Sequence, residues 1–282
     1  MENSHIQWTD HTFNPWEGCT KVSPGCLHCY AEARNQRFVA GANWGVGAPR
    51  RRTSAANWMQ PIKWNAAQRK LAQMELSTPR PRVFCASLAD WLDPEVDIEW
   101  LADLLEIIYG APMLDWLMLT KRPEMWMERM LGVLEFWRTS GVSNDGVCEW
   151  LKDWLWFFGK GKPPLNIWIG TTVEDQARAR IRIPQLMKIP ATIRFLSCEP
   201  LLEPIDLNLS TLEPSLDPDW VICGGESGPG CRPMELGWAR DLYHQCFGAG
   251  VSFFMKQLGG HPVKRGELQQ FPEDLRVRQF PV

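Results

Sequence analysis

The hydrophobic pattern of the chain has one rhythm, in which short apolar runs alternate with longer stretches of helical spacing. Each run is rich in β-branched and aromatic residues, and short runs of this kind favour buried strands. The runs lie at residues 82–87, 115–120, 166–170, 192–197, 220–223 and 251–255. A shorter segment that leads into Phe13-Asn14-Pro15-Trp16 precedes them and predicts a short first strand.

The stretches between these runs predict helices. Proline suits a first helical turn, so Pro123 marks one start, and Thr172 to Asp175 resembles a capping box that opens another helix. Gly248 and Gly250 are expected to end the last helix. The predicted helices lie at about residues 30–38, 97–109, from 123 onward, after 175, and at 235–246.

Strands that alternate with helices favour parallel pairing and right-handed crossovers. The pattern therefore predicts an α/β fold, a partial (β/α) barrel of about six to seven parallel strands with a cysteine loop after the first strand. A doubly wound sheet is the alternative. We expect a single domain over residues 1–282, with a helical insertion at about 140–164 that serves as a packing helix, a lid or a partner surface.

Composition narrows the class of protein. The chain has 282 residues, 45% of them hydrophobic, which supports a sizeable core rather than disorder. A net charge of −3 argues against a protein that coats duplex nucleic acid with a basic surface. Sixteen tryptophans serve either as core filler or, for a few, as base-stacking platforms. The N-terminus does not read as a secretory leader and no run is long enough for a membrane span, so we expect a cytoplasmic protein.

Three cysteines, Cys19, Cys26 and Cys29, fall close together on a loop broken by Pro24 and Gly25. Three thiolates complete neither a closed zinc site nor an all-cysteine iron–sulfur cluster, each of which takes four ligands. Three interpretations remain: a zinc site completed by His28, three unrelated structural thiols, or an iron–sulfur cluster with one open iron.

Polar residues follow six consecutive predicted strands. In a (β/α) barrel the active site lies at the carboxyl ends of the strands, so these residues are expected to form one rim. They are Ser87 and Asp90; Thr120, Lys121 and Arg122; Thr171, Thr172 and Glu174; Ser197, Cys198 and Glu199; Gly224, Gly225, Glu226 and Ser227; and Lys256 with Gln257.

Two further segments are candidates for binding an anion. Residues 224–230 are rich in glycine and either bring backbone N–H groups close to a ligand or form a plain tight turn. Lys121 and Arg122 are the best candidates to hold an anionic group. Residues 40–52 read as a mobile loop, in which residues 50–52, three arginines, either bind an anion or form a solvated charge run.

The cysteine loop after a short first strand resembles that of the radical S-adenosylmethionine (SAM) superfamily, although the spacing is C-x6-C-x2-C rather than the commoner C-x3-C-x2-C. A closer resemblance, along almost the whole chain, is to a phage-associated, three-cysteine-motif, radical-SAM-like family of unassigned substrate. The motifs that carry it are Trp8-Thr9-Asp10, Asn14-Pro15, Gly18-Cys19, Ser23-Pro24-Gly25-Cys26, His28-Cys29-Tyr30-Ala31-Glu32, Leu119-Thr120-Lys121-Arg122-Pro123, Ser197, Glu199-Pro200-Leu201-Leu202, Gly224-Gly225-Glu226-Ser227-Gly228 and Lys256-Gln257.

The resemblance implies that Cys19, Cys26 and Cys29 hold a 4Fe-4S cluster whose fourth iron is chelated by SAM. It implies reductive cleavage of SAM to methionine and a 5′-deoxyadenosyl radical, which takes a hydrogen atom from a substrate. We assign SAM contacts to Ser87, Asp90, Thr120, Glu174, Gly224 and Gly225, and substrate contact or catalysis to Lys121, Arg122, Glu199, Glu226, Lys256 and Gln257.

The resemblance also implies partners. The electron would come from a flavodoxin or a ferredoxin, and association with phage suggests a nucleotide or a single-stranded nucleic acid as substrate. Cys198 and Cys231 are expected to be buried, chemically quiet thiols rather than ligands of a second cluster. The alternative from another class is a non-catalytic, zinc-stabilised phage protein that binds nucleic acid or a host protein.

Overall fold

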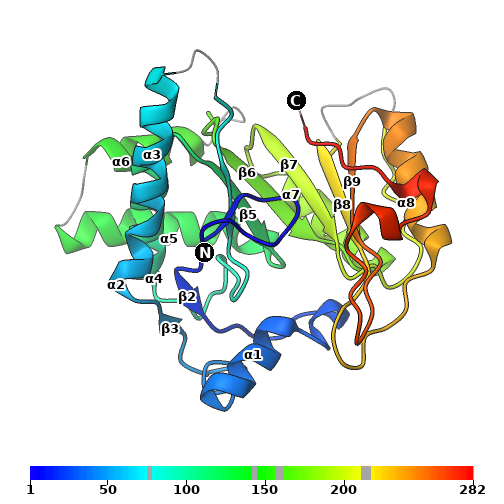
Figure 1. Ribbon diagram of the computed structural model, residues 1–282. Helices are drawn as coiled ribbons and strands as arrows, with labels where there is room; N and C mark the ends of the chain where they lie inside the picture. Colours follow the sequence, from blue (N-terminus) through cyan, green and yellow to red (C-terminus); the bar gives the residue numbers. More distant parts are fainter. Residues whose placement is uncertain (75–77, 142–144, 156–161, 211–216, 282) are drawn as a thin grey trace.

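The computed structural model describes residues 1–74, 78–141, 145–155, 162–210 and 217–281. Within these residues seven parallel strands form one sheet, curved into a half-barrel of 212° (Figure 1). The strands are β1 (His11–Thr12), β4 (Arg82–Cys85), β5 (Asp115–Thr120), β6 (Ile167–Thr172), β7 (Ile193–Cys198), β8 (Trp220–Gly224) and β9 (Ser252–Gln257). The prediction of a partial (β/α) barrel with a cysteine loop after its first strand is confirmed.

The strand order excludes the doubly wound alternative. Neighbours in the sheet follow the chain from β1 through β4 to β9 without reversal, whereas a doubly wound sheet reverses direction at a switch point. A second, antiparallel pair joins β2 (Trp16–Glu17) to β3 (Arg51–Arg52). Because β3 ends the segment 40–52, part of the stretch predicted as a mobile loop is instead a strand.

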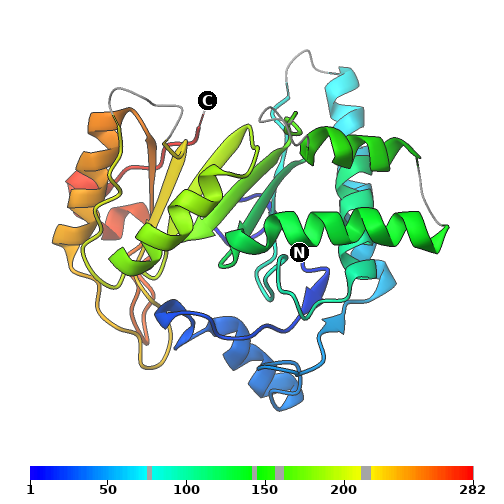
Figure 2. The same cartoon turned by 180° about the vertical axis from the view of Figure 1, so that it is seen from behind.

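Helices cover the outer face of the half-barrel (Figures 1 and 2). Their apolar sides and one face of the sheet enclose a large core, which includes Leu104, Val133 and Leu242. The helices are α1 (Tyr30–Val39), α2 (Ala55–Trp58), α3 (Gln60–Met74), α4 (Ile98–Gly110), α5 (Trp126–Ser140), α6 (Asp145–Leu155), α7 (Gln176–Met187) and α8 (Leu236–Ala249). Short 3-10 turns lie at Pro24–Cys26, Pro123–Met125, Leu268–Gln270 and Glu273–Leu275. No helix among the described residues is both long enough and apolar enough to cross a membrane.

Aromatic side chains fill the inner face of the sheet. The N-terminal segment crosses this face and inserts Trp8, whose ring lies 4.6 Å from that of Phe84 and 6.3 Å from that of Trp220 between centroids. Among the described residues, seven tryptophans are almost completely buried, which supports core filling as their role. They are Trp8, Trp16, Trp91, Trp116, Trp137, Trp154 and Trp220.

Two local predictions about helix ends need correction, and a helix was missed. Thr172 belongs to β6, and the N-cap of α7 is Asp175, whose carboxylate accepts from the backbone N–H of Arg178 at 2.8 Å. Gly248 lies inside α8, and Gly250, with φ of 72°, is the left-handed residue that ends it. The helix α3 was not predicted.

The predicted insertion at 140–164 contains α6, which packs against α4 and α5. Residues 142–144 and 156–161 of that stretch lie outside the described residues. That the chain is a single domain, and that this segment is an insertion into it, stay predictions.

Gly170 on β6 gives a test of the packing inside the half-barrel. A Cβ at this position would lie 2.4 Å from two carbons of the buried Phe195 ring on β7. We expect Gly170→Ala to lower the free energy of unfolding by roughly 1–3 kcal/mol, because the ring must shift within a packed core. The measurement is urea denaturation. The matched control is Gly248→Ala, whose Cβ would meet nothing within 4 Å and should leave stability unchanged or slightly higher. Equal stabilities for the two variants would contradict this packing.

Candidate functional site

A cavity of about 660 Å³ lies at the carboxyl ends of the strands, where the cysteine loop and α1 bridge the end of the half-barrel (Figure 2). It is lined by the strand ends, by the cysteine loop and by the start of α1. The predicted site residues that line it are Cys19, Cys26, Cys29, Ser87, Asp90, Thr120, Lys121, Glu199, Gly225, Glu226, Lys256 and Gln257. Arg122, Glu174 and Gly224 are not among the lining residues.

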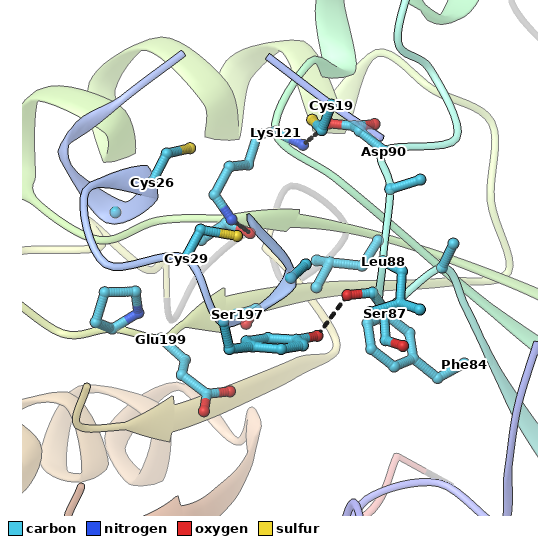
Figure 3. A pocket seen from close by; sticks show the side chains of 18 of the residues that line it. Cys19, Cys26, Cys29, Phe84, Ser87, Leu88, Asp90, Lys121, Ser197 and Glu199 are labelled. Atoms are coloured by element: carbon cyan, nitrogen blue, oxygen red, sulfur yellow. Dashed lines mark hydrogen bonds between the residues drawn. The ribbon is translucent and has the colours of Figure 1, made fainter. Parts of the chain in front are cut away.

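The three cysteines reach this cavity from three local structures. Cys19 follows β2, Cys26 ends the 3-10 turn that Pro24 begins, and Cys29 is the N-cap residue of α1. All three are free thiols; Cys26 is buried, and the other two are half-buried. Figure 3 shows them on one side of the cavity, around the side chain of Lys121.

Each sulfur atom has hydrogen-bond donors near it. The Arg122 guanidinium donates to Cys19 Sγ at 3.6 Å, and the Ser23 hydroxyl lies 3.8 Å from Cys26 Sγ. Burial raises the pKa of Cys29, but the backbone N–H groups of the first turn of α1 and the Lys121 ammonium oppose that rise. The donor set therefore suits three thiolates, since each would gain a favourable partner when it loses its proton.

Without a metal the thiols of Cys19 and Cys29 hold their protons. Burial, together with the nearby Asp90 carboxylate, raises the pKa of Cys19 to about 11. Only the thiolate form of cysteine binds a metal, so binding must release these protons.

A closed zinc site is not preformed at the loop. No group of three His, Cys, Asp or Glu side chains among the described residues is placed to hold a single metal ion. The His28 ring lies beside the loop after β8, where a Cβ on Gly230 would be 3.2 Å from it. The three cysteines share one cavity, and each has a hydrogen-bond donor near its sulfur; the group that they would hold stays a prediction.

Asp90 and Arg122 form an ion pair behind Cys19. Arg122 Nη1 lies 2.9 Å from Asp90 Oδ2, and each side chain is 6% exposed. Asp90 also accepts from Thr120 Oγ1 at 2.6 Å, from the Lys121 backbone N–H at 2.8 Å and from that of Leu92 at 3.1 Å. The pair thus positions the loop between β5 and α5 against the cysteine loop. Contacts of Asp90 and Thr120 to SAM, and of Arg122 to a substrate, stay predictions.

Glu174 holds the cysteine loop from the other side. Its carboxylate accepts from the Gly25 backbone N–H at 3.2 Å and from Arg182 of α7 at 2.8 Å. Burial opposes ionisation of Glu174, but Arg182 and Lys121 outweigh it and hold the pKa of Glu174 below its usual value. Glu174 is fully buried and is not among the residues that line the cavity, and its contact to SAM stays a prediction.

Two carboxylates that line the cavity, Glu199 and Glu226, are each bound by a cation. Lys256 Nζ donates to both oxygens of Glu199, at 2.5 and 2.6 Å, and Arg232 donates to Glu226. Gln257 donates to Gly225 O at 2.7 Å, while its buried Oε1 has no hydrogen-bond partner among the described residues.

The glycine-rich loop after β8 packs closely against the chain after β9. A Cβ on Gly225 would lie 2.4 Å from Leu258 O, and the Gly225 N–H donates to Gln257 O at 3.0 Å. The close approach that glycine permits is therefore to a neighbouring loop. Contact of Gly224 or Gly225 with a cofactor stays a prediction.

Two other sequence-based expectations need correction. The arginines of residues 50–52 are all paired, so they form neither a free anion site nor a solvated run. Arg50 is buried against Asp93 at 2.9 Å, while the next two pair with Glu17 and Asp103. Cys198 is buried as expected, but Cys231 is only half-buried.

Several lining residues had not been singled out from the sequence. Asn14 Oδ1 accepts from the backbone N–H groups of Ser87 and Leu88, each at 2.8 Å, and so fixes the end of β4. The Tyr30 hydroxyl donates to Ser87 O at 2.6 Å, and Lys264 reaches the cavity from beyond β9. Asn14 and Tyr30 stand within motifs of the family resemblance, whereas no pattern marks Lys264.

The fold and site define an α/β half-barrel with a three-cysteine cavity at its mouth. The chain belongs to the family described as "Protein of unknown function (DUF5131)", which matches residues 3–276. No curated protein and no solved structure matches the chain.

Proposed function

We propose that the protein is a radical SAM enzyme, in which Cys19, Cys26 and Cys29 hold three irons of a 4Fe-4S cluster and SAM binds the fourth. The observation that carries the proposal is that these free thiols, from one loop, share a cavity with the polar ends of the barrel strands. When bound, the cluster and SAM supply one-electron cleavage of SAM and abstraction of hydrogen from a substrate.

The chain's own residues would orient the ligands and exclude water. Trp8, Phe84 and Leu119 give the cavity an apolar wall, while the strand ends give it a polar rim. Lys121, whose ammonium donates to Thr172 Oγ1 at 3.1 Å, lies near Cys29 and can attract an anionic group of SAM. Gln257 also lines the cavity, held in place by its amide N–H donation to Gly225 O at 2.7 Å.

The remaining assignments follow from the resemblance and from position. Ser87, Asp90, Thr120, Glu174, Gly224 and Gly225 are proposed to contact or support SAM, and Arg122, Glu199, Glu226 and Lys256 to act on the substrate side. A flavodoxin or ferredoxin would deliver the electron, and the substrate would be a nucleotide or an unpaired nucleic-acid strand. A reducing cytoplasm would keep the thiols available for iron.

The test is anaerobic purification followed by incubation with dithionite and SAM. We expect about four iron and four sulfide per chain, and 5′-deoxyadenosine as a product detected by mass spectrometry. Stoichiometric zinc, with no cleavage of SAM, would contradict the proposal and favour the zinc-stabilised binding protein.

A further inference from the structure

The Asp90–Arg122 ion pair lies next to the sulfur atom of Cys19. Arg122 places three donor contacts at once, to Asp90 Oδ2 at 2.9 Å, to Thr20 O at 2.9 Å and to Cys19 Sγ at 3.6 Å. The guanidinium is therefore fixed by two oxygen acceptors while its charge faces the sulfur.

The two other thiols have different hydrogen-bond donors near them. Cys26 has the neutral Ser23 hydroxyl beside it, and Cys29 has backbone N–H groups of α1 together with the nearby Lys121 ammonium. In the part of the chain that the structure describes, one cationic side chain, that of Arg122, donates a hydrogen bond to one of these sulfurs, Cys19 Sγ. The environment of the cluster would thus be asymmetric.

We propose that the buried Asp90–Arg122 pair tunes the reduction potential of the cluster through Cys19, with the two charges acting in opposite directions. The proposal rests on the proposed function, because it requires an iron–sulfur cluster on the three cysteines. It gives Arg122 and Asp90 a positioning and tuning role at the cluster, in addition to their proposed places beside SAM and substrate.

The direction of each effect follows from charge. A low-potential reductant such as dithionite gives one electron to the cluster, which gains one negative charge. A cationic donor at Cys19 Sγ stabilises the added charge and raises the potential, whereas the Asp90 carboxylate behind it lowers the potential. Each side chain is only 6% exposed, so water and salt screen these charges weakly.

The experiment is a potentiometric titration of the anaerobically reconstituted protein, followed by electron paramagnetic resonance. Arg122→Gln should make the reduction potential more negative by at least about 59 mV. For a one-electron step, this shift is a tenfold change in the equilibrium constant for reduction. Asp90→Asn should shift it in the positive direction. The control Arg138→Gln, at an exposed pair on α5, should not shift it.

Iron content and thermal unfolding of each variant are measured alongside, because a merely structural role would lower both without opposite shifts in potential. An unchanged potential in Arg122→Gln, or shifts of the same sign in both variants, would overturn the proposal. If Arg122→Gln loses iron, the Asp90→Asn variant decides the test: a positive shift in its reduction potential supports the proposal, and a negative or absent shift overturns it. A wild-type protein that holds no cluster would instead overturn the proposed function, and this inference with it.

Discussion

Replacement of Cys26 by alanine is expected to abolish both iron retention and the formation of 5′-deoxyadenosine. Cys26 is the buried member of the three thiols, at the end of the 3-10 turn that Pro24 begins. Its loss would leave two thiolates for a cluster that takes three from this loop. The measurements are iron and sulfide per chain after anaerobic reconstitution, and 5′-deoxyadenosine with dithionite and SAM.

The matched control is Cys148→Ala on α6, a half-buried thiol that does not line the cavity. It should keep wild-type iron content and wild-type cleavage of SAM. Full activity in Cys26→Ala would show that the assignment of the iron ligands is wrong, whereas equal losses in both variants would point to a general loss of folding.

Arg182→Ala is expected to lower the free energy of unfolding by roughly 3–5 kcal/mol, because it leaves a buried carboxylate without its cation. Arg182 pairs with Glu174 at 2.8 Å, and the two side chains are 6% and 0% exposed. Arg182 also donates to Thr172 O at 2.9 Å, so the end of β6 loses a contact as well. Urea denaturation measures the change.

Two further variants separate charge from packing. The double replacement Arg182→Leu with Glu174→Leu should recover much of the lost stability, since apolar residues often replace a buried pair at little cost. Arg138→Ala, in an exposed pair, should change stability little. A loss for Arg182→Ala no larger than that for Arg138→Ala would contradict the buried-pair account.

The sheet was predictable because its strands are apolar on both faces and end in polar residues. The predicted run at 115–120 coincides with β5, and the parallel order follows from the intervening helices. The helix α3 escaped prediction because its buried side chains include Asn65 and Gln68, which break the apolar periodicity. Asn65 is instead held by long-range hydrogen bonds to Gly110 and Met113.

The outline of the site was also predictable, because it follows from the parallel order of the strands. Parallel strands bring their carboxyl ends to one mouth, so residues as distant in sequence as Ser87 and Lys256 line one cavity. Their partners were not predictable, because charge pairing depends on side-chain positions. Arg122 was predicted to hold a substrate anion, but its guanidinium lies between Asp90 and Cys19.

The central claim is that the three cysteines leave one iron of the cluster open to SAM. Mössbauer spectroscopy, on protein reconstituted with the Mössbauer-active iron isotope, tests this claim most directly. The account predicts that adding SAM changes the signal of one iron subsite and leaves the other three unchanged. Iron signals that do not respond to SAM, or a reconstituted protein that retains no iron, would contradict it.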